Sequence, residues 1–212
     1  MNQYLLPLFP LNVVVCPQGL VPLRIFEARY LDMVKSALRN KSPFAIVTVL
    51  PINLADNQTQ VNANNHFPFS DTGTLVEIIE ADVSTVGLMM IRCAGIHRIK
   101  VESYSQQSDG LVIGKVSTIA NDAELRIPED LQIASTCLQR LLESLSGQGV
   151  TPTDIPVLKP YKFDDASWVA NRWLELLDLP LLQKQRLMQM DSPILRLEMI
   201  NDILDVNLNK SV

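Results

Sequence analysis

The chain has 212 residues, 47% of them hydrophobic and 19% charged, which is enough for a buried core in one large or two small domains and excludes disorder of the whole chain. Up to Thr118, nine Lys and Arg balance nine Asp and Glu, and the remainder has nine against fourteen, so the net charge of −5 lies in the second half. Neither half has the basic excess that phosphate contacts require, and nucleic acid is therefore disfavoured as the main partner.

The opening stretch is apolar, and no charged side chain precedes Arg24. A secretory signal needs a basic segment ahead of an unbroken apolar run, and a membrane-spanning helix needs about 20 apolar residues. Four prolines interrupt the stretch: Pro7, Pro10, Pro17 and Pro22. We therefore expect a soluble, cytoplasmic protein with no membrane partner.

The first half alternates short β-branched or apolar runs with turns, a pattern typical of strands. Strands are predicted at Leu11–Val15, Phe44–Leu50, Thr74–Ala81, Leu88–Cys93, Ile96–Tyr104 and Leu111–Ile119. Asp109–Gly110 predicts a hairpin turn between the last two. One helix interrupts the strands, because apolar residues recur at three- and four-residue spacing in IFEARYLDMVKSALRN, residues 25–40.

The second half has helical periodicity instead. Helices are predicted at Asp130–Ser146, Asp164–Leu177, Pro180–Met190 and Pro193–Val206. The chain is thus expected to have an α+β fold: an antiparallel β unit with one inserted helix, residues 1–120, followed by a helical bundle, residues 121–212.

Candidate catalytic residues are few. A phosphate-binding loop needs G-x-x-x-x-G-K-[ST], and the similar run Gly110–Val116 is one residue short and lacks the hydroxyl. Only two histidines could act as bases: His97 belongs to a predicted strand and His66 to a polar loop. Three cysteines far apart in the sequence form neither a disulfide framework nor a zinc framework, and we expect reduced, buried thiols. No catalytic, cofactor or metal site is predicted.

One stretch remains as a candidate binding site: HFPFSD, at the end of the polar segment 52–72. Loops of this length inside a compact domain are usually functional or mobile. His66, Phe67 and Phe69 could present an apolar patch to an extended peptide, because aromatic side chains dominate protein interfaces. Local packing of the two aromatics against the β unit is the alternative.

The opening stretch, with its Leu-Pro-Leu strand, proline loop, Pro-Leu pair and helix, resembles the start of the Lon protease N-terminal (substrate-binding) domain family. Three later stretches agree with that family in order and spacing: Gly73–Ile78 with its Gly-Thr strand, Gly95–Ile99 with its Gly-x-x-Arg element, and Leu181–Leu204 with its C-terminal helices. The IFEARY form of the helix start is most similar to stand-alone bacterial members.

The resemblance implies a PUA-like pseudo-barrel followed by a helical bundle. In full-length Lon this region helps to recognise protein substrates, and the ATPase and Ser-Lys protease modules follow it. This sequence has neither a phosphate loop nor a protease module, so we expect a non-catalytic module, without a cofactor, that binds unfolded or extended polypeptide or a specific protein partner. An RNA-associated PUA-like module is the alternative. The oligomeric state is left open between a monomer and a weak dimer.

Overall fold

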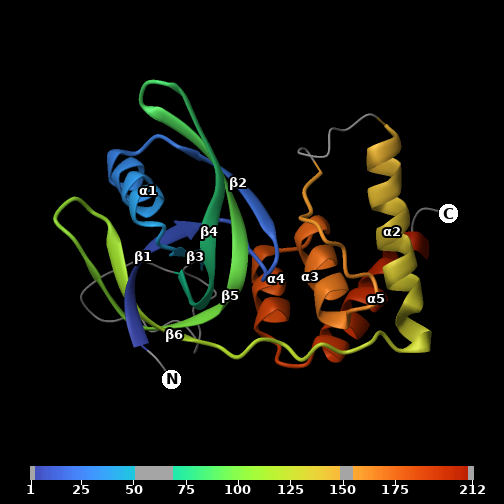
Figure 1. Cartoon of the computed structure of the whole chain (residues 1–212). Helices are drawn as coiled ribbons and strands as arrows, with labels where there is room; N and C mark the ends of the chain where they lie inside the picture. The colour runs from blue at the N-terminus through green and yellow to red at the C-terminus, as the bar shows by residue number, and fades with distance from the viewer. Residues whose placement is uncertain (1–2, 51–68, 149–154, 210–212) are drawn as a thin grey trace. The chain divides into compact units, whose positions relative to one another are not determined.

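The computed structural model describes residues 3–50, 69–148 and 155–209, with no side-chain detail at 84–85 and 206–209. The chain divides into two compact units, residues 1–121 and 122–212 (Figure 1). Strands occupy the first and helices most of the second, so the predicted α+β fold is confirmed. Among the described residues, no helix has both the length and the apolar character needed to span a membrane.

Unit 1 is a mixed sheet that closes on itself. Its strands are β1 (Gln3–Leu11), β2 (Leu20–Ile25), β3 (Phe44–Val49), β4 (Phe69–Thr85), β5 (Leu88–Gln106) and β6 (Val112–Thr118). Their order is β2-β5-β4-β3-β1-β6, and β5 also pairs with β6. The second pairing joins five strands into a barrel, and β2 lies alongside β5 outside that ring.

The expectation of a wholly antiparallel unit is wrong at one pair of described strands. β1 and β3 run parallel, whereas the other pairings are antiparallel. A parallel pair needs a crossover connection of a dozen or more residues. Here the crossover contains β2 and the helix α1 (Ala28–Asn40), so the single inserted helix is what permits the parallel pair.

The first strand lies earlier than the residue pattern predicted, at the Leu-Pro-Leu run where the family resemblance places a strand, because its prolines are compatible with pairing. In the described ladders, β1 pairs with β6 from Gln3 to Leu8 and with β3 from Leu8 to Leu11. Pro7 thus lies beside β6 only, and Pro10 beside β3 only. Proline cannot donate to a ladder, so it is tolerated where one side of the strand needs no donor.

The predicted strand Leu11–Val15 is therefore wrong beyond its first residue. Val14 and Val15 are buried, but they belong to a loop. Threonine hydroxyls from neighbouring strands replace the ladder bonds: Thr48 donates to the Val13 carbonyl at 3.1 Å, and Thr74 donates to that of Val15. Because buried carbonyls need a donor, these two bonds allow a buried apolar loop.

The two strands predicted on either side of Gly95 form one continuous strand, β5. Gly95 does not end the strand, because it lies where another backbone comes close: a Cβ there would be 2.2 Å from the Cys16 carbonyl oxygen. The predicted hairpin between β5 and β6 is confirmed, with Gly110 at φ 87° in its turn.

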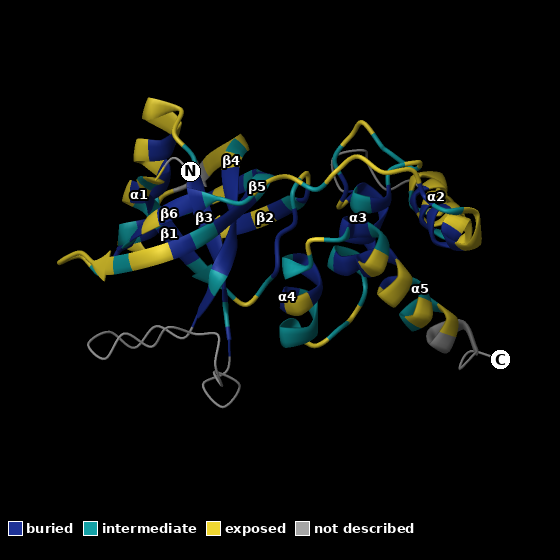
Figure 2. Cartoon of the chain, turned by 90° about the horizontal axis from the view of Figure 1, so that it is seen from below, coloured by how far each residue is buried: buried dark blue, intermediate teal, exposed yellow. Residues whose placement is uncertain are grey.

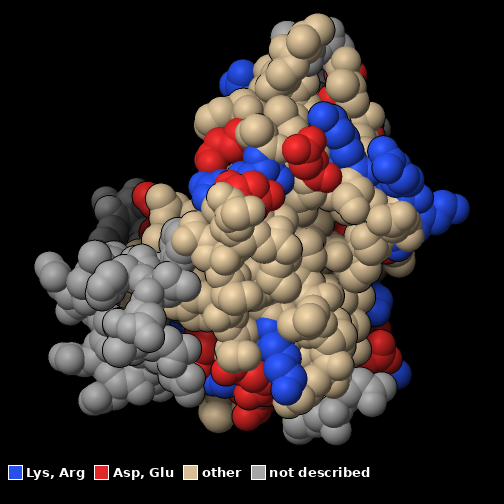
Figure 3. Space-filling view, turned by 90° about the vertical axis from the view of Figure 1, so that its left-hand side faces the viewer, with Lys and Arg blue, Asp and Glu red and all other residues tan. Residues whose placement is uncertain are grey.

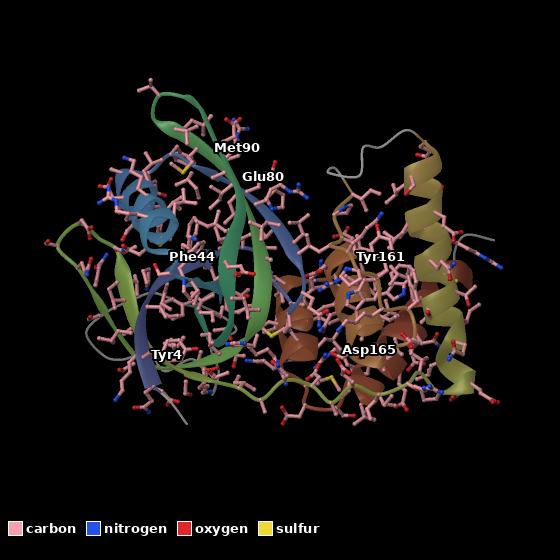
Figure 4. All side chains as sticks on the ribbon, viewed as in Figure 1. Tyr4, Phe44, Glu80, Met90, Tyr161 and Asp165 are labelled. Carbon is pink, nitrogen blue, oxygen red and sulfur yellow. The ribbon has the colours of Figure 1, made fainter. Side chains whose placement is uncertain are left out.

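The core of unit 1 lies within the barrel and beneath α1. Phe44 and Ile46 of β3 face the cluster that α1 covers, whereas Ala45 and Val47 face a second cluster, so this strand is buried on both sides (Figures 2 and 4). Four side chains of α1 reach the core: Tyr30, Met33, Val34 and Ala37. The helix is thus positioned by its predicted apolar stripe.

Unit 2 contains a 3₁₀ turn and four helices: η2 (Glu129–Leu131), α2 (Gln132–Gly147), α3 (Ala166–Leu176), α4 (Leu181–Gln189) and α5 (Pro193–Asn209). These agree with the predicted helices to within a few residues at each end. α3 is the central helix, because most of its residues are buried, and α2, α4 and α5 contact it. Its first turn is capped by Asp165, whose carboxylate accepts the Trp168 N–H at 2.7 Å.

Candidate functional site

The predicted loop site is only partly described by the structure. Phe69 begins β4, is 5% exposed, and packs in the barrel core with its ring 4.9 Å from that of Tyr104. Local packing, the alternative to partner binding, therefore describes Phe69 in this structure. His66 and Phe67 lie outside the described residues, and their partner-binding role stays a prediction.

The β4–β5 hairpin presents exposed apolar side chains that were not predicted. Figure 1 shows this hairpin rising beyond the rest of the barrel. Val86 and Gly87 form its turn, and Gly87 has a φ of 79°, which glycine adopts without steric cost. Val86 is fully exposed and Val83 is 63% exposed. Both valines therefore expose apolar surface at the tip of the hairpin, although Met89 of β5 near them is buried.

Phe26 lies at the same end of the sheet. It follows directly after Ile25, which pairs with Met89 of β5. The neighbouring pair, Arg24 and Met90, points to the outer face, and both of its side chains are exposed. Phe26 itself is 69% exposed although its helical spacing predicted a core position. It lies before the first turn of α1, so the stripe of that helix does not cover it.

A bulge in β4 adds one more apolar side chain. The pairing with β5 shifts between Ile78 and Glu80, which leaves Ile79 unpaired and exposed. Five exposed apolar residues thus lie along the outer half of this hairpin and at the adjoining end of β2. We call them the hairpin surface: Phe26, Ile79, Val83, Val86 and Met90.

Charges near the hairpin surface are largely neutralised in pairs. Arg92 bonds Glu80 at 2.8 Å, and Arg29 bonds Glu27 at 2.7 Å while also donating to the Gly110 carbonyl. Figure 4 shows Glu80 and Met90 along the same hairpin, and Figure 3 shows its tip as a largely uncharged projection. The arrangement therefore favours contact with apolar groups over attraction of either charge.

The cysteine thiols have the properties of core residues. Cys16 and Cys93 are free and buried as predicted, whereas Cys137 is half-buried. Burial raises the pKa of Cys93 to about 12, which keeps it as the unreactive thiol at neutral pH. Within the part of the chain that the structure describes, no three His, Cys, Asp or Glu side chains are grouped as metal ligands would be.

Sequence reasoning missed the hairpin surface because its residues were interpreted as ordinary strand and turn. Alternation predicts which face a strand side chain occupies, but not whether the core extends that far. One signal was present: the run ADVSTVGLMM continues the apolar pattern across a turn with a single charge, Asp82, whereas hairpin ends are usually protected by several.

Comparison with known proteins identifies the family to which this sequence and fold belong. The family model described as the ATP-dependent protease La (LON) substrate-binding domain matches residues 5–206. No curated protein matches the chain. The crystal structure of a Lon N-terminal domain protein from Xanthomonas campestris is 30% identical, covers 94% of this chain and 98% of its own, and has a TM-score of 0.71.

A second solved structure supports the fold alone. The N-terminal domain of a Mycobacterium avium complex Lon protease is 15% identical, covers 94% of this chain and 97% of its own, and has a TM-score of 0.59. Both solved structures are Lon N-terminal domains, and the family model is that of the Lon substrate-binding domain. The chain belongs to the Lon substrate-binding domain family.

Proposed function

We propose that this protein is a non-catalytic module that binds apolar segments of unfolded or extended polypeptide through the hairpin surface. The observation that carries the proposal is the group of exposed apolar side chains on a projecting hairpin, in a family whose description is substrate binding. Monomeric proteins rarely expose contiguous apolar patches unless these patches bind something. Specific recognition of one folded partner is the narrower form of the same function.

The free energy expected from covering these side chains favours weak binding of many different sequences. Covering the exposed part of one such side chain contributes about 1 to 2 kcal/mol at about 25 cal/mol per Å². Several of them together offset the association cost of at least about 4 kcal/mol and leave a modest surplus. Because the surface carries charges of both signs and no excess of either, many apolar sequences would be accepted, as substrate recognition requires.

A PUA-like barrel acting in the cytoplasm completes the proposal. The five-stranded barrel, with β2 alongside it and one covering helix, supports the first part. The free cysteines support the second, because disulfides are rare in reducing compartments.

The test replaces Phe26, Val83 and Val86 with serine and measures binding to a permanently unfolded, reduced and alkylated protein by fluorescence anisotropy. Affinity should fall at least about tenfold, because three of the apolar contacts are lost. Leu5→Ser is the matched control: this leucine of β1 is equally exposed but lies outside the hairpin surface, and its loss should leave binding unchanged.

Unchanged binding by the triple variant, with an unchanged melting temperature, would show that another surface is used. Absence of binding by the wild-type protein would contradict the function itself. A salt titration separates the RNA alternative, since phosphate contacts give a steep loss of affinity with salt and apolar contacts do not.

A further inference from the structure

α5 of unit 2 has an apolar row that the described residues of its own unit leave exposed or half-buried. Leu195 and Met199 are spaced one turn apart, at 52% and 46% exposure, and the half-buried Ile203 continues the row. The opposite side of the helix packs in the unit through Leu197 and Ile200. Figure 2 shows this division along α5, with exposed and buried strips side by side. Residues at i and i+4 lie on one helix face, so the row is continuous.

An acidic row runs beside the apolar one. Glu198, Asp202 and Asp205 are exposed and follow each other at spacings of four and three. No ion pair to these three carboxylates forms among the described residues. Arg196 is the one basic residue of α5, and it is buried and bonded to Asp122. The exposed charged groups of α5 are thus all acidic over its described side chains.

This charge arrangement is unfavourable for an isolated helix. Like charges at i, i+4 repel one another, and acids in the last turns face the negative end of the helix dipole. η2, which packs against α5, adds the exposed Glu129 and Asp130 to the same unit. A basic ligand would relieve this repulsion, whereas a second acidic copy of the chain would increase it.

We propose that the exposed side of α5 docks a basic amphipathic helix of a partner protein. The apolar row (Leu195, Met199 and Ile203) would receive the partner's apolar stripe, and the acidic row would pair with its flanking Lys or Arg side chains. This surface belongs to unit 2 and is independent of the hairpin surface of unit 1. The protein would therefore bind polypeptide substrate with one unit and a regulatory or effector protein with the other.

The probe is a fluorescein-labelled peptide of about 18 residues, about 27 Å when helical, with Leu and Lys in amphipathic helical order. Two comparison peptides have the same composition in scrambled order and the same order with Glu in place of Lys. With the full chain, anisotropy should show binding of the first and at least about tenfold weaker binding of the others, because docking needs both the stripe and the charge.

Two variants localise the binding. E198Q/D202N/D205N should weaken it roughly fivefold, and more at low salt, because exposed ion pairs are individually weak and screened. L195S/M199S should weaken it about tenfold. Each variant has a matched control elsewhere in the chain. D32N/E77Q/E143Q removes three exposed carboxylates, as the acidic-row variant does. I133S/L141S on α2 removes two exposed apolar side chains, as the apolar-row variant does. Neither control should change the affinity more than about twofold.

Equal weakening by the control variants would reduce the effect to general attraction between a basic peptide and an acidic protein, and would overturn the proposal. Equal binding of the scrambled peptide would do the same. A dimer seen by light scattering that L195S/M199S dissociates would assign the surface to a second copy instead.

Discussion

Asp165 shows how a single residue couples helix capping to pH. Burial raises the pKa of its carboxyl above the ordinary value of 3.8, although its bond with the Trp168 N–H acts in the opposite direction. The folded protein therefore holds the proton more tightly than the unfolded chain. The resulting stability is fully present below pH 3.8 and is lost as pH rises through the raised pKa. At neutral pH the buried charge of the Asp165 carboxylate lowers the stability of the folded protein, whereas its hydrogen bond to the first turn of α3 raises it.

Two substitutions separate these effects. Asp165→Asn keeps an oxygen that caps α3 but removes the buried charge, so we expect it to be at least as stable as the wild type at pH 7, with the difference fading toward pH 4. Asp165→Ala loses the cap and should cost about 1 kcal/mol near pH 4, and less at pH 7, where it also removes the buried charge. Urea denaturation at the two pH values measures this. Equal destabilisation by both substitutions at pH 7 would contradict it.

Two residues that match the family pattern, Gly73 and Thr74, have structural roles that explain their identity. A Cβ on Gly73 would lie 2.4 Å from the Ile46 carbonyl oxygen, so only glycine fits between β4 and β3. The hydroxyl of Thr74, the next residue, donates a hydrogen bond to the Val15 carbonyl and so holds the loop in place. Such roles could not be predicted from the sequence alone, because close approach of two backbones depends on which segments meet. The exposure of Val83 and Val86 had only a weak signal in the sequence, because alternation does not tell whether a strand residue has a neighbour to cover it.

At the scale of elements, local periodicity predicted the helices well and the strands less well. An amphipathic stripe and its capping residues lie within one helix, as in α3, so the sequence contains the information. β1 was displaced because two prolines argue against a strand until its neighbours are known. β5 was divided because a glycine inside a strand and a glycine ending one look alike.

A buried ion pair links the first residue of unit 2, Asp122, to its last helix through Arg196. Arg196 of α5 donates to Asp122 at 2.7 Å, to the Asn171 side chain at 2.9 Å and to the carbonyls of Leu187 and Met190. Ser167 also donates to Asp122 at 2.6 Å. The guanidinium thus joins α3, α4 and α5, and one carboxylate balances its charge.

Asp122→Asn should destabilise the protein by about 3 kcal/mol, because a buried guanidinium then lacks its counter-charge. Asp32→Asn is the matched control on the exposed Lys35 pair, and it should cost less than about 1 kcal/mol. Chemical denaturation gives both values. A cost for Asp122→Asn no larger than that of the control would show that Arg196 is satisfied by its carbonyl and amide acceptors alone.

At the scale of the whole molecule, the division between units leads to a prediction about independent folding. We propose that residues 1–121 and 122–212 are separate domains, since each has its own core. Expressed separately, each fragment should show one cooperative thermal transition. A fragment that starts at Leu125 should melt lower than 122–212, because it lacks the partner of Arg196. An unfolded 122–212 fragment would contradict the assignment.

The pairing of β1 with β6 has a consequence for synthesis on the ribosome. These strands are the first and last of the barrel, and their register joins Gln3 with Ser117. The barrel cannot close until β6 has left the exit tunnel, because long-range pairing waits for both partners. During that interval the apolar β1 has no place in a finished sheet, and nascent chains in this condition are prone to aggregate. The nascent chain should therefore stop depending on chaperones when β6 emerges from the ribosome, well before the helices of unit 2 have been synthesised.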